Sequence, residues 1–177
     1  MPLFKRPDRE FLKTDRPLNI AHRGGRGLSP EHTIFAYKKA LNVGADVLEL
    51  DVHSTKDSEI IVIHDPKVDR TTDGKGKVNE LTLSEIKRLD AGYRFAIKRG
   101  NKEEYPFRGK RLFIPALQEV FNEFPNQRIN IEIKQIEPQI EDALFAIIKE
   151  MKMIDKVLVV SENNEAIKRF RKISKGA

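Results

Sequence analysis

The sequence predicts a single-domain α/β fold in which mostly parallel strands are joined by helices. Two observations support this prediction. Short apolar or alternating stretches, typical of strands, are separated mostly by segments whose apolar residues recur at helical spacing. The chain has 177 residues, of which 39% are hydrophobic, and this suffices for one buried core. The five predicted strands are residues 18–21, 47–53, 60–63, 129–134 and 157–160.

The first predicted strand follows a charged segment and precedes a glycine-rich loop. Residues 1–16 mix charges of both signs without periodicity, so we expect a frayed arm and a domain over residues 17–177. The glycine-rich loop, residues 22–27, comes directly after the strand. Residues 29–31 (Ser-Pro-Glu) favour a helix start, and residues 42–44 (Asn-Val-Gly) favour its end.

The next two predicted strands flank a short turn. Residues 47–53 alternate in polarity, residues 56–58 have turn chemistry, and residues 60–63 form a continuous apolar run. We expect these strands to join the sheet in parallel, through helical crossovers. A short helix is predicted over residues 83–89, capped near Ser84.

The second half of the chain continues this alternation after an irregular segment. Residues 90–112 are rich in Gly, Arg, Lys and aromatic residues and predict a loop. Helices are then predicted before, between and after the last two strands. They span about residues 115–124, 138–152 and 162–173.

Composition and charge exclude several classes of protein. A run of about 18 apolar residues is missing, which excludes a transmembrane helix, and the charged start is unlike a secretory signal. The lack of cysteine excludes disulfides and thiolate metal sites and fits a cytoplasmic protein. The formal charge is +6, from 33 Lys and Arg against 27 Asp and Glu. These basic residues are scattered without aromatic interleaving, which disfavours nucleic-acid binding.

Polar side chains share one face of two predicted strands. Because successive strand residues point to opposite faces, Glu49, Asp51 and His53 lie on one face. On the fourth strand, Glu132 and Lys134 share a face in the same way. Such alternation is also typical of an antiparallel strand with one solvent-exposed face. The two strands together, with histidines nearby, favour a functional site.

Two histidines come directly after predicted strands. His22 follows the first strand and His64 follows the third, and all four histidines of the chain lie between these two positions. If the strands are neighbours, their polar groups converge at the carboxyl ends of the sheet. That edge is where α/β folds place their active sites.

The residue types at this edge suit the cleavage of a phosphoester. Carboxylates such as Glu49 and Asp51 are ligands for Mg²⁺ or Ca²⁺ rather than Zn²⁺, and Glu132 can complete the set. The side chains of Arg23 and Lys134 supply positive charge for a phosphate, and the backbone N–H groups around Gly24 and Gly25 can add an anion-binding nest. His22 and His64 can act as acid and base near neutral pH.

Seven short motifs occur in a fixed order along the chain. They are His22-Arg23-Gly24, Pro30-Glu31-His32-Thr33, Glu49-Leu50-Asp51, Thr55-Lys56-Asp57, His64-Asp65, the segment 115–120, and Ile131-Glu132-Ile133-Lys134. This ordered series resembles the glycerophosphodiester phosphodiesterase family over about residues 18–165. One such triplet alone is a weak signal, whereas the series is specific.

The resemblance implies an eight-stranded β/α (TIM) barrel that hydrolyses glycerophosphodiesters to an alcohol and sn-glycerol 3-phosphate. It further implies a divalent cation, Mg²⁺ or Ca²⁺. By position, the metal carboxylates are Glu49, Asp51 and Glu132, the acid/base pair is His22 and His64, and the phosphate-binding residues are Arg23 and Lys134.

Residues 90–112 match a variable insert that shapes the substrate pocket in the family. Its aromatic residues can form an apolar wall for a lipid or alcohol group, although packing of the insert against the domain is the favoured interpretation. These residues are Tyr93, Phe95, Tyr105 and Phe107. Lysophospholipids are therefore alternative substrates to the small glycerophosphodiesters.

Three single residues have alternative interpretations. His32 stands where the family usually has Asn, and a structural role at the helix start is favoured over contact with substrate. Ala116 stands where the family usually has Thr, which we interpret as a detail of helix capping. His53 either lines the pocket or lies at its rim without a role.

The chain is short for the implied barrel, which needs about 250 residues. Only five strands are predicted, so we expect a barrel truncated after about five β/α units. Two open sheet edges would then favour pairing with a missing piece or with a second copy. The alternative function is a non-catalytic fragment that binds phosphoesters or a partner without turnover.

Overall fold

The computed structural model describes residues 10–175. Its helices are α1 (Ile34–Asn42), α2 (Leu83–Ile86), α3 (Leu117–Glu123), α4 (Glu141–Glu150) and α5 (Asn164–Ser174). Its strands are β1 (Ile20–Ala21), β2 (Val47–Ser54), β3 (Ile60–Val62), β4 (Ile97–Arg99), β5 (Lys102–Glu104), β6 (Arg128–Ile133) and β7 (Val157–Val160). Short 3₁₀ turns are η1 (Glu10–Leu12), η2 (His22–Gly24), η3 (Val78–Glu80) and η4 (Ile154–Lys156).

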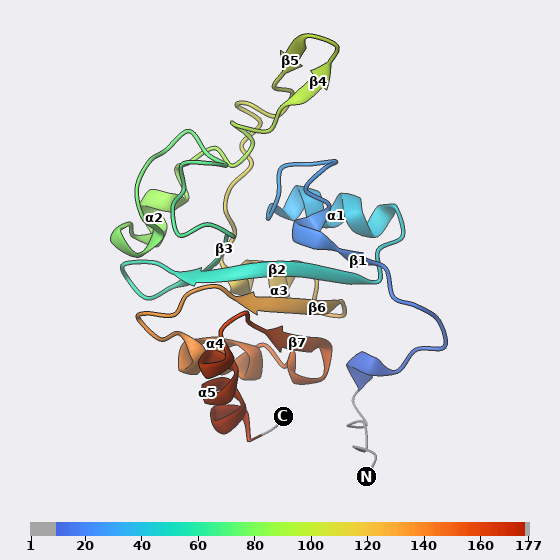
Figure 1. Ribbon diagram of the computed structural model, residues 1–177, viewed down its shortest axis with the longest axis vertical. Helices are drawn as coiled ribbons and strands as arrows, with labels where there is room; N and C mark the ends of the chain where they lie inside the picture. Colours follow the sequence, from blue (N-terminus) through green and yellow to red (C-terminus); the bar gives the residue numbers. More distant parts are fainter. Residues whose placement is uncertain (1–9, 176–177) are drawn as a thin grey trace.

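Four parallel strands form the centre of the sheet in the order β1-β2-β6-β7. Figure 1 shows these strands following one another down the page. Because α1 to α5 carry the chain between or after strands, each parallel pair is joined by a crossover, as predicted. The register of β2 and β6 pairs Asp51 with Glu132 and Glu49 with Asn130. The predicted α/β class with a parallel sheet is confirmed.

The third strand departs from the prediction, because β3 runs antiparallel to β2. Only five residues, 55–59, connect the two strands, which is too short for the crossover that a parallel pair requires. The turn at residues 56–58 is therefore a hairpin turn, and its Ser58 has a positive φ of 65°. His64 consequently approaches β2 from the end of an antiparallel strand.

One face of the sheet packs against helices and forms the main hydrophobic core. Leu48, Leu50 and Val52 of β2 are fully buried there with Ile129 and Ile131 of β6. Helices α1, α3, α4 and α5 supply most of the other apolar side chains of this core, and β3 adds Ile60 and Val62. The opposite face of β2 is buried as well, although it carries the polar residues of the strand. The fold thus places charged groups where solvent is largely excluded.

The segment between β3 and α3 builds a second, smaller core. It consists of Ile61, Ile63, Val68, Val78, Ile86, Ala91 and Ile114. The insert that follows was expected to be an irregular loop, but β4 and β5 form an exposed antiparallel hairpin that projects from the molecule (Figure 1). These three-residue strands are mostly charged and solvent-exposed, so their sequence carries no alternation that would reveal them.

Helix boundaries differ from the predictions in ways that local chemistry explains. Helix α1 begins at Ile34 rather than near residue 29, because His32 has a positive φ of 58° and Thr33 is the N-cap. Helix α2 is capped by Thr82 instead of Ser84, in a capping box with Glu85. Ala116, the N-cap of α3, has no capping oxygen.

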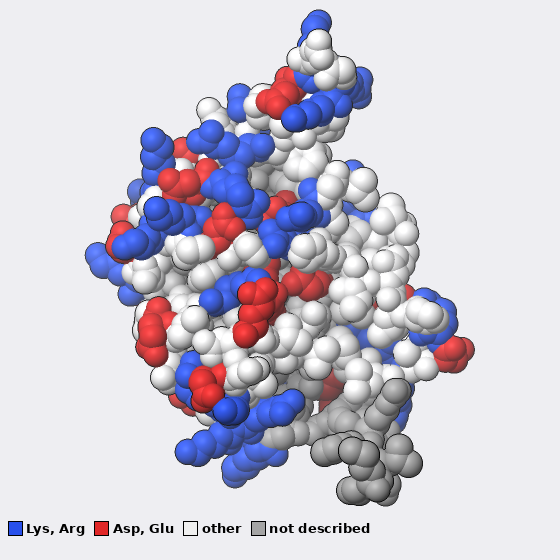
Figure 2. Space-filling view, viewed as in Figure 1, with Lys and Arg blue, Asp and Glu red and all other residues white. Residues whose placement is uncertain are grey.

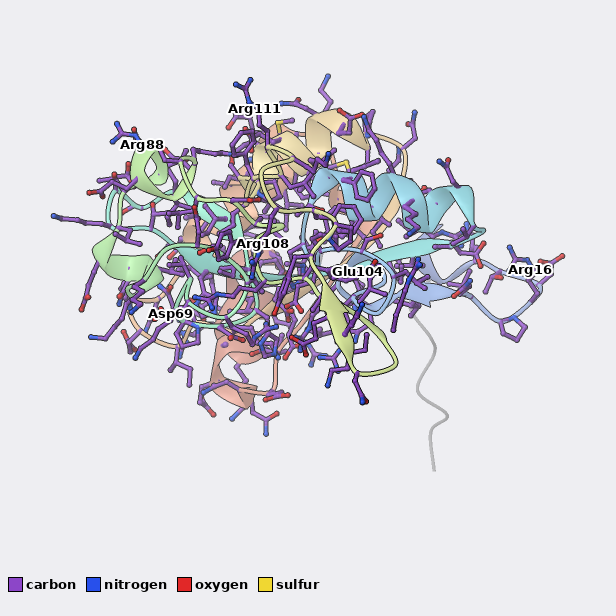
Figure 3. The ribbon with its side chains drawn as sticks, turned by 90° about the horizontal axis from the view of Figure 1, so that it is seen from above. Arg16, Asp69, Arg88, Glu104, Arg108 and Arg111 are labelled. Atoms are coloured by element: carbon purple, nitrogen blue, oxygen red, sulfur yellow. The ribbon has the colours of Figure 1, made fainter. Side chains whose placement is uncertain are left out.

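The described part of the N-terminal segment is anchored instead of frayed, while residues 1–9 lie outside the described residues. The side chain of Phe11 is only 6% exposed. Arg16 forms a bidentate ion pair with Asp46, with N···O distances of 2.5 and 2.8 Å. In Figure 3, Arg16 lies at one end of the molecule and Arg88 at the other. Asp46 precedes β2, so this ion pair lies at the amino end of the strand.

Two further surface features bear on function. An apolar groove of about 320 Å³ lies beside β7 between η1, α4 and α5, and none of the predicted site residues lines it. On the face in Figure 2, basic and acidic side chains are intermixed, with a smaller basic group over α5. Among the described residues, none of the helices has the length and apolar character needed to span a membrane.

Leu144 tests the packing of the main core. It is fully buried in α4, so Leu144→Ala should lower the free energy of unfolding by about 2–5 kcal/mol through lost burial and a cavity. Val43→Ala is the control, because Val43 is 66% exposed and should change stability by less than about 0.5 kcal/mol. Urea denaturation measures both. Equal effects of the two substitutions would contradict the described core.

Candidate active site

Three carboxylates converge on the polar face of β2 and β6. One ligand oxygen each from Glu49, Asp51 and Glu132 can be chosen so that all lie within 4.8 Å of one another. The parallel register causes this arrangement, because it places Asp51 beside Glu132, with Glu49 two residues earlier on the same face. Glu49 and Asp51 are buried and Glu132 is partly buried. The structure therefore brings together the three carboxylates that the sequence analysis selected.

The loop after β1 holds Glu49 through a backbone hydrogen bond. The N–H of Arg23 donates to Oε2 of Glu49 at 2.7 Å. Burial raises the pKa of Glu49 to about 7, and the neighbouring charges of Asp51 and Glu132 add to the effect, while the hydrogen bond from Arg23 opposes it. Glu49 is thus the carboxylate that most lacks a compensating positive charge.

Several N–H groups of the loop that was expected to form an anion-binding nest bind acceptors within the protein. The N–H groups of Gly25 and Arg26 donate to the carbonyl oxygen of His22 at 2.9 and 3.3 Å, and that of Arg23 donates to Glu49. Gly24 is needed here, since its φ is +73° and a Cβ would lie 2.9 Å from the ring of Tyr37. The loop therefore packs tightly against α1.

Asp51 is the most buried of the three carboxylates, and two basic side chains approach its Oδ2. The ring Nε2 of His32 lies at 2.8 Å and Nε of Arg23 at 3.5 Å from this oxygen. Burial alone would raise the pKa of Asp51, but the hydrogen bond to His32 and the positive charge of Lys134 lower it below the ordinary value. Asp51 is therefore ionised at neutral pH.

Lys134 extends from the end of β6 toward the carboxylates. Its Nζ donates to Oε1 of Glu132 at 2.7 Å and lies 3.7 Å from Oδ1 of Asp51. Burial acts to lower the pKa of Lys134, but Glu132 and Asp51 outweigh it and raise the pKa. The lysine therefore keeps its charge beside the cluster.

The donor set fits a divalent cation. Two permanently charged side chains, Arg23 and Lys134, lie beside the three carboxylates, and burial together with the charges of Asp51 and Glu132 raises the pKa of Glu49. Carboxylate oxygens are the donors that hard cations such as Mg²⁺, Ca²⁺ and Mn²⁺ prefer. The site thus has the composition and spacing to hold such an ion.

A second network orients His64. Its ring Nδ1 lies 2.6 Å from Oδ1 of Asp65. Arg70 binds Asp65 with contacts of 2.6 and 3.1 Å and also binds Glu31 with contacts of 2.6 and 2.9 Å. Glu31 in turn lies 3.4 Å from a guanidinium nitrogen of Arg23. The loop after β3 is therefore connected to the loop after β1 through one arginine.

This network fixes which ring nitrogen of His64 is available. A carboxylate only accepts hydrogen bonds, and Arg70 together with His64 lowers the pKa of Asp65 to about 2 although burial opposes the shift. Nδ1 of His64 must therefore carry the hydrogen atom in this bond. In the neutral ring, Nε2 is then left as the proton acceptor.

The other two candidate histidines have different surroundings. His22 directly follows β1 and is largely exposed, and its pKa is lowered by the partial burial of its ring and by the charges of Arg23 and Arg26. His53 is buried, and its Nε2 donates to the carbonyl oxygen of His64 at 3.0 Å. His53 thus holds the backbone that carries His64.

The aromatic residues of the insert pack mainly against each other and against α1. The ring of Phe107 lies 5.3 Å from that of Phe95 and 5.2 Å from that of Phe35 in α1. The guanidinium of Arg108 lies over the rings of Tyr93 and Tyr105, at 4.4 and 3.6 Å from their centroids. This geometry favours the packing interpretation over an open apolar wall.

Comparison with known families decides the assignment. The model of the glycerophosphoryl diester phosphodiesterase family matches residues 22–174, which includes every predicted site residue. The chain belongs to this family. A glycerophosphodiester phosphodiesterase of Caldanaerobacter subterraneus is 43% identical over 164 residues, which cover 90% of this chain and 63% of the relative. A lysophospholipase D of Homo sapiens is 37% identical over 136 residues, covering 75% and 40%.

Solved structures of the family have the same fold. The glycerophosphodiester phosphodiesterase of Agrobacterium tumefaciens superimposes with a TM-score of 0.79 at 30% identity, over 90% of this chain and 64% of its own. An Oleispira antarctica phosphodiesterase, in complex with the product sn-glycerol-3-phosphate, gives 0.72 at 27% identity, over 89% and 62%. The TIM-barrel type of the fold is thus confirmed. The chain spans less than two-thirds of the length of each of these four proteins.

Sequence reasoning assigned no role to several residues that complete the site. Glu31 and Asp65 stood in the motifs without a role, and Arg70 and Tyr37 were outside them. Asp65 directly follows a candidate catalytic histidine, a signal that an orienting carboxylate was present. Arg70 gives no such signal, because its contact with Glu31 joins residues 39 positions apart.

The Asp65 network predicts a pH-dependent contribution to stability. Since the pKa of Asp65 is about 2 when folded, below the ordinary 3.8, its ionised form stabilises the fold above pH 4. This contribution is lost as the pH falls from 4 toward 2. Asp65→Asn should therefore lower the free energy of unfolding at pH 6 by about 1 kcal/mol or less, with the difference from wild type shrinking below pH 4.

Urea denaturation at pH 6, 4 and about 2.5 measures this difference. Asp155→Asn is the control, because Asp155 is an exposed residue of η4 outside the network, and its effect should not follow this pH course. A difference for Asp65→Asn that grows at low pH would contradict the network.

Proposed function

We propose that this chain is a metal-dependent phosphodiesterase that hydrolyses glycerophosphodiesters to an alcohol and sn-glycerol 3-phosphate. The observation that carries the proposal is the convergence of Glu49, Asp51 and Glu132 within 4.8 Å beside two basic side chains. Family membership and the bound product in the Oleispira relative support the same activity.

The chain's own residues suit the binding of a phosphodiester. A divalent cation, Mg²⁺ or Ca²⁺, would be held by the three carboxylates, and when bound it supplies charge that polarises a phosphoryl oxygen. Arg23 and Lys134 place fixed positive charge on either side of the cluster, which favours the negative charge that develops on the phosphoryl group. Nε of Arg23 is buried without a hydrogen-bond partner among the described residues, as expected of a donor kept for an anion.

The two histidines at the ends of β1 and β3 suit proton transfer. In neutral His64, Nε2 is the free acceptor, because Nδ1 is held by Asp65. His22 is exposed and has a lowered pKa, so it is largely neutral at pH 7 and can accept a proton. We assign to this pair the removal of a proton from the attacking group and the donation of one to the leaving alcohol.

The acyl chain on the glycerol moiety distinguishes two substrate classes. The similarity to a lysophospholipase D supports lysophospholipids as alternative substrates. The side chain of Phe35 in α1 is 40% exposed and offers apolar surface for an acyl chain, and Phe107 of the insert packs against it. Glycerophosphocholine and lysophosphatidylcholine therefore serve as parallel substrates.

The activity is tested by measuring release of glycerol 3-phosphate from glycerophosphocholine. We expect release with Mg²⁺ or Ca²⁺, none with chelator, and a loss of about a hundredfold or more in Glu49→Ala, which removes a metal ligand. Glu80→Ala is the control, because Glu80 is a surface carboxylate in η3 that pairs only with Lys77 in the described chain.

Three outcomes would contradict this proposal in different ways. Release that survives chelation or Glu49→Ala contradicts the metal site. A folded protein that binds cation without releasing product supports the alternative, a non-catalytic phosphoester-binding fragment. Release of choline from lysophosphatidylcholine, without hydrolysis of glycerophosphocholine, would make lysophospholipids the substrate class instead.

The open edges of the sheet predict self-association. Because β1 and β7 are edges of the described sheet, each can pair with a strand of a second copy. Size-exclusion chromatography measures this, and a compact monomer would contradict the prediction.

The acid/base assignment predicts a separate effect on turnover. His22→Asn and His64→Asn should each lower kcat by about 10²–10⁴-fold, since neither variant can transfer a proton. Binding of Mn²⁺ should stay within about threefold of wild type, because neither histidine is a proposed ligand. Steady-state kinetics and a Mn²⁺ titration measure the two effects. A variant that retains full kcat removes that histidine from the mechanism.

A further inference from the structure

His32 occupies a constrained position between the loop after β1 and helix α1. Its φ of 58° lies in the left-handed region that a non-glycine residue seldom adopts. Its N–H donates to the carbonyl oxygen of Arg23 at 3.1 Å, and only 3% of the residue is exposed. The side chain therefore points into the protein and has no access to solvent.

Both ring nitrogens of His32 have partners. Nε2 lies 2.8 Å from Oδ2 of Asp51, and Nδ1 lies 2.9 Å from the hydroxyl of Tyr37. The carboxylate can only accept, so Nε2 carries a hydrogen atom, and Nδ1 of the neutral ring accepts from the O–H of Tyr37. Burial raises the pKa of Tyr37 well above its ordinary value, so its hydroxyl keeps the hydrogen atom that it donates. The chain of hydrogen bonds thus selects one tautomer.

The start of helix α1 does not explain these contacts. Thr33 is the N-cap, and its hydroxyl accepts a hydrogen bond from the N–H of Ala36 at 3.1 Å. The capping requirement is met without the ring of His32. The imidazole instead reaches 19 positions along the chain to β2.

The consequence for Asp51 is a fixed carboxylate orientation. His32 and Arg23 both approach Oδ2, whereas Oδ1 lies on the side of β6, 3.7 Å from Nζ of Lys134. A carboxylate held at one oxygen by a buried donor cannot rotate freely, and its other oxygen stays directed at the cluster. Partners of this kind orient ligands in metal sites.

We propose that His32, held in one tautomer by Tyr37, is a positioning residue that presents Oδ1 of Asp51 to a divalent cation. The proposal rests on the proposed function and deepens it. It assigns a role to a position where the family resemblance implies Asn, and to a tyrosine that the sequence analysis did not select.

Paired substitutions at His32 separate positioning from a merely structural role. His32→Ala removes the donor to Asp51, whereas His32→Gln can place an amide N–H where Nε2 was. Both replacements meet the same strained backbone conformation and lose the imidazole ring. We therefore expect similar unfolding midpoints. His32→Ala should weaken Mn²⁺ binding by about 10–100-fold, and His32→Gln should remain within about threefold of wild type.

The measurements do not depend on turnover. Mn²⁺ affinity is measured by electron paramagnetic resonance of the free ion, on folded protein. The ¹⁵N chemical shifts of His32 report the tautomer, and we expect protonated Nε2 and unprotonated Nδ1. Tyr37→Phe preserves the buried ring that packs edge-on against Phe124 but removes the donor. It should shift the Nδ1 signal and weaken Mn²⁺ binding by a few fold.

Each alternative result has a distinct meaning. Equal Mn²⁺ affinity in wild type and folded His32→Ala overturns the role of His32 and leaves the proposed metal centre intact. Equal losses in His32→Ala and His32→Gln also overturn it, since the donor is then irrelevant. A wild type that binds no Mn²⁺ overturns the metal centre, and the role of His32 falls with it.

Discussion

Mutual repulsion among three carboxylates on a largely buried sheet face is the constraint that the rest of the site satisfies. Glu49, Asp51 and Glu132 are drawn together by the register of β2 and β6, and neither strand can relieve the repulsion by itself. Burial strengthens such repulsion, since charges interact more strongly where water is excluded. The surrounding polar contacts offset this cost: a backbone N–H donates to Glu49, the ring of His32 and the guanidinium of Arg23 approach Asp51, and the ammonium of Lys134 contacts Glu132.

The loops that supply these donors are tied to each other as well as to the sheet. Arg70 connects Glu31 in the loop after β1 to Asp65 in the loop after β3, and Asp65 orients His64. A network in which one arginine serves two carboxylates holds two chain segments in a single arrangement. His64 and the carboxylate cluster are consequently connected by one continuous set of contacts, through Asp65, Arg70, Glu31 and Arg23.

The parallel strands and the convergence of the three carboxylates could be predicted because they depend on local pattern. Alternation placed Glu49 and Asp51 on one strand face, and motif order placed Glu132 and Lys134 beside them. What could not be predicted depends on contacts between distant residues. The antiparallel pairing of β3 with β2 could not be predicted, because a continuous apolar run does not indicate the direction of a strand. The buried position of the His32 side chain could not be predicted either. Its positive φ accompanies contacts with Tyr37 and Asp51, which the sequence does not show.

Strand β2 is buried on both faces, with apolar side chains toward the helices and ionisable ones toward the cluster. A shift of one residue in its pairing would exchange these two sets, sending Leu50 into the charged face and Asp51 into the hydrocarbon core. We therefore expect any misaligned form to be far less stable than the native one. The carboxylates of the candidate site thus also favour the native register of β2 over a shifted one.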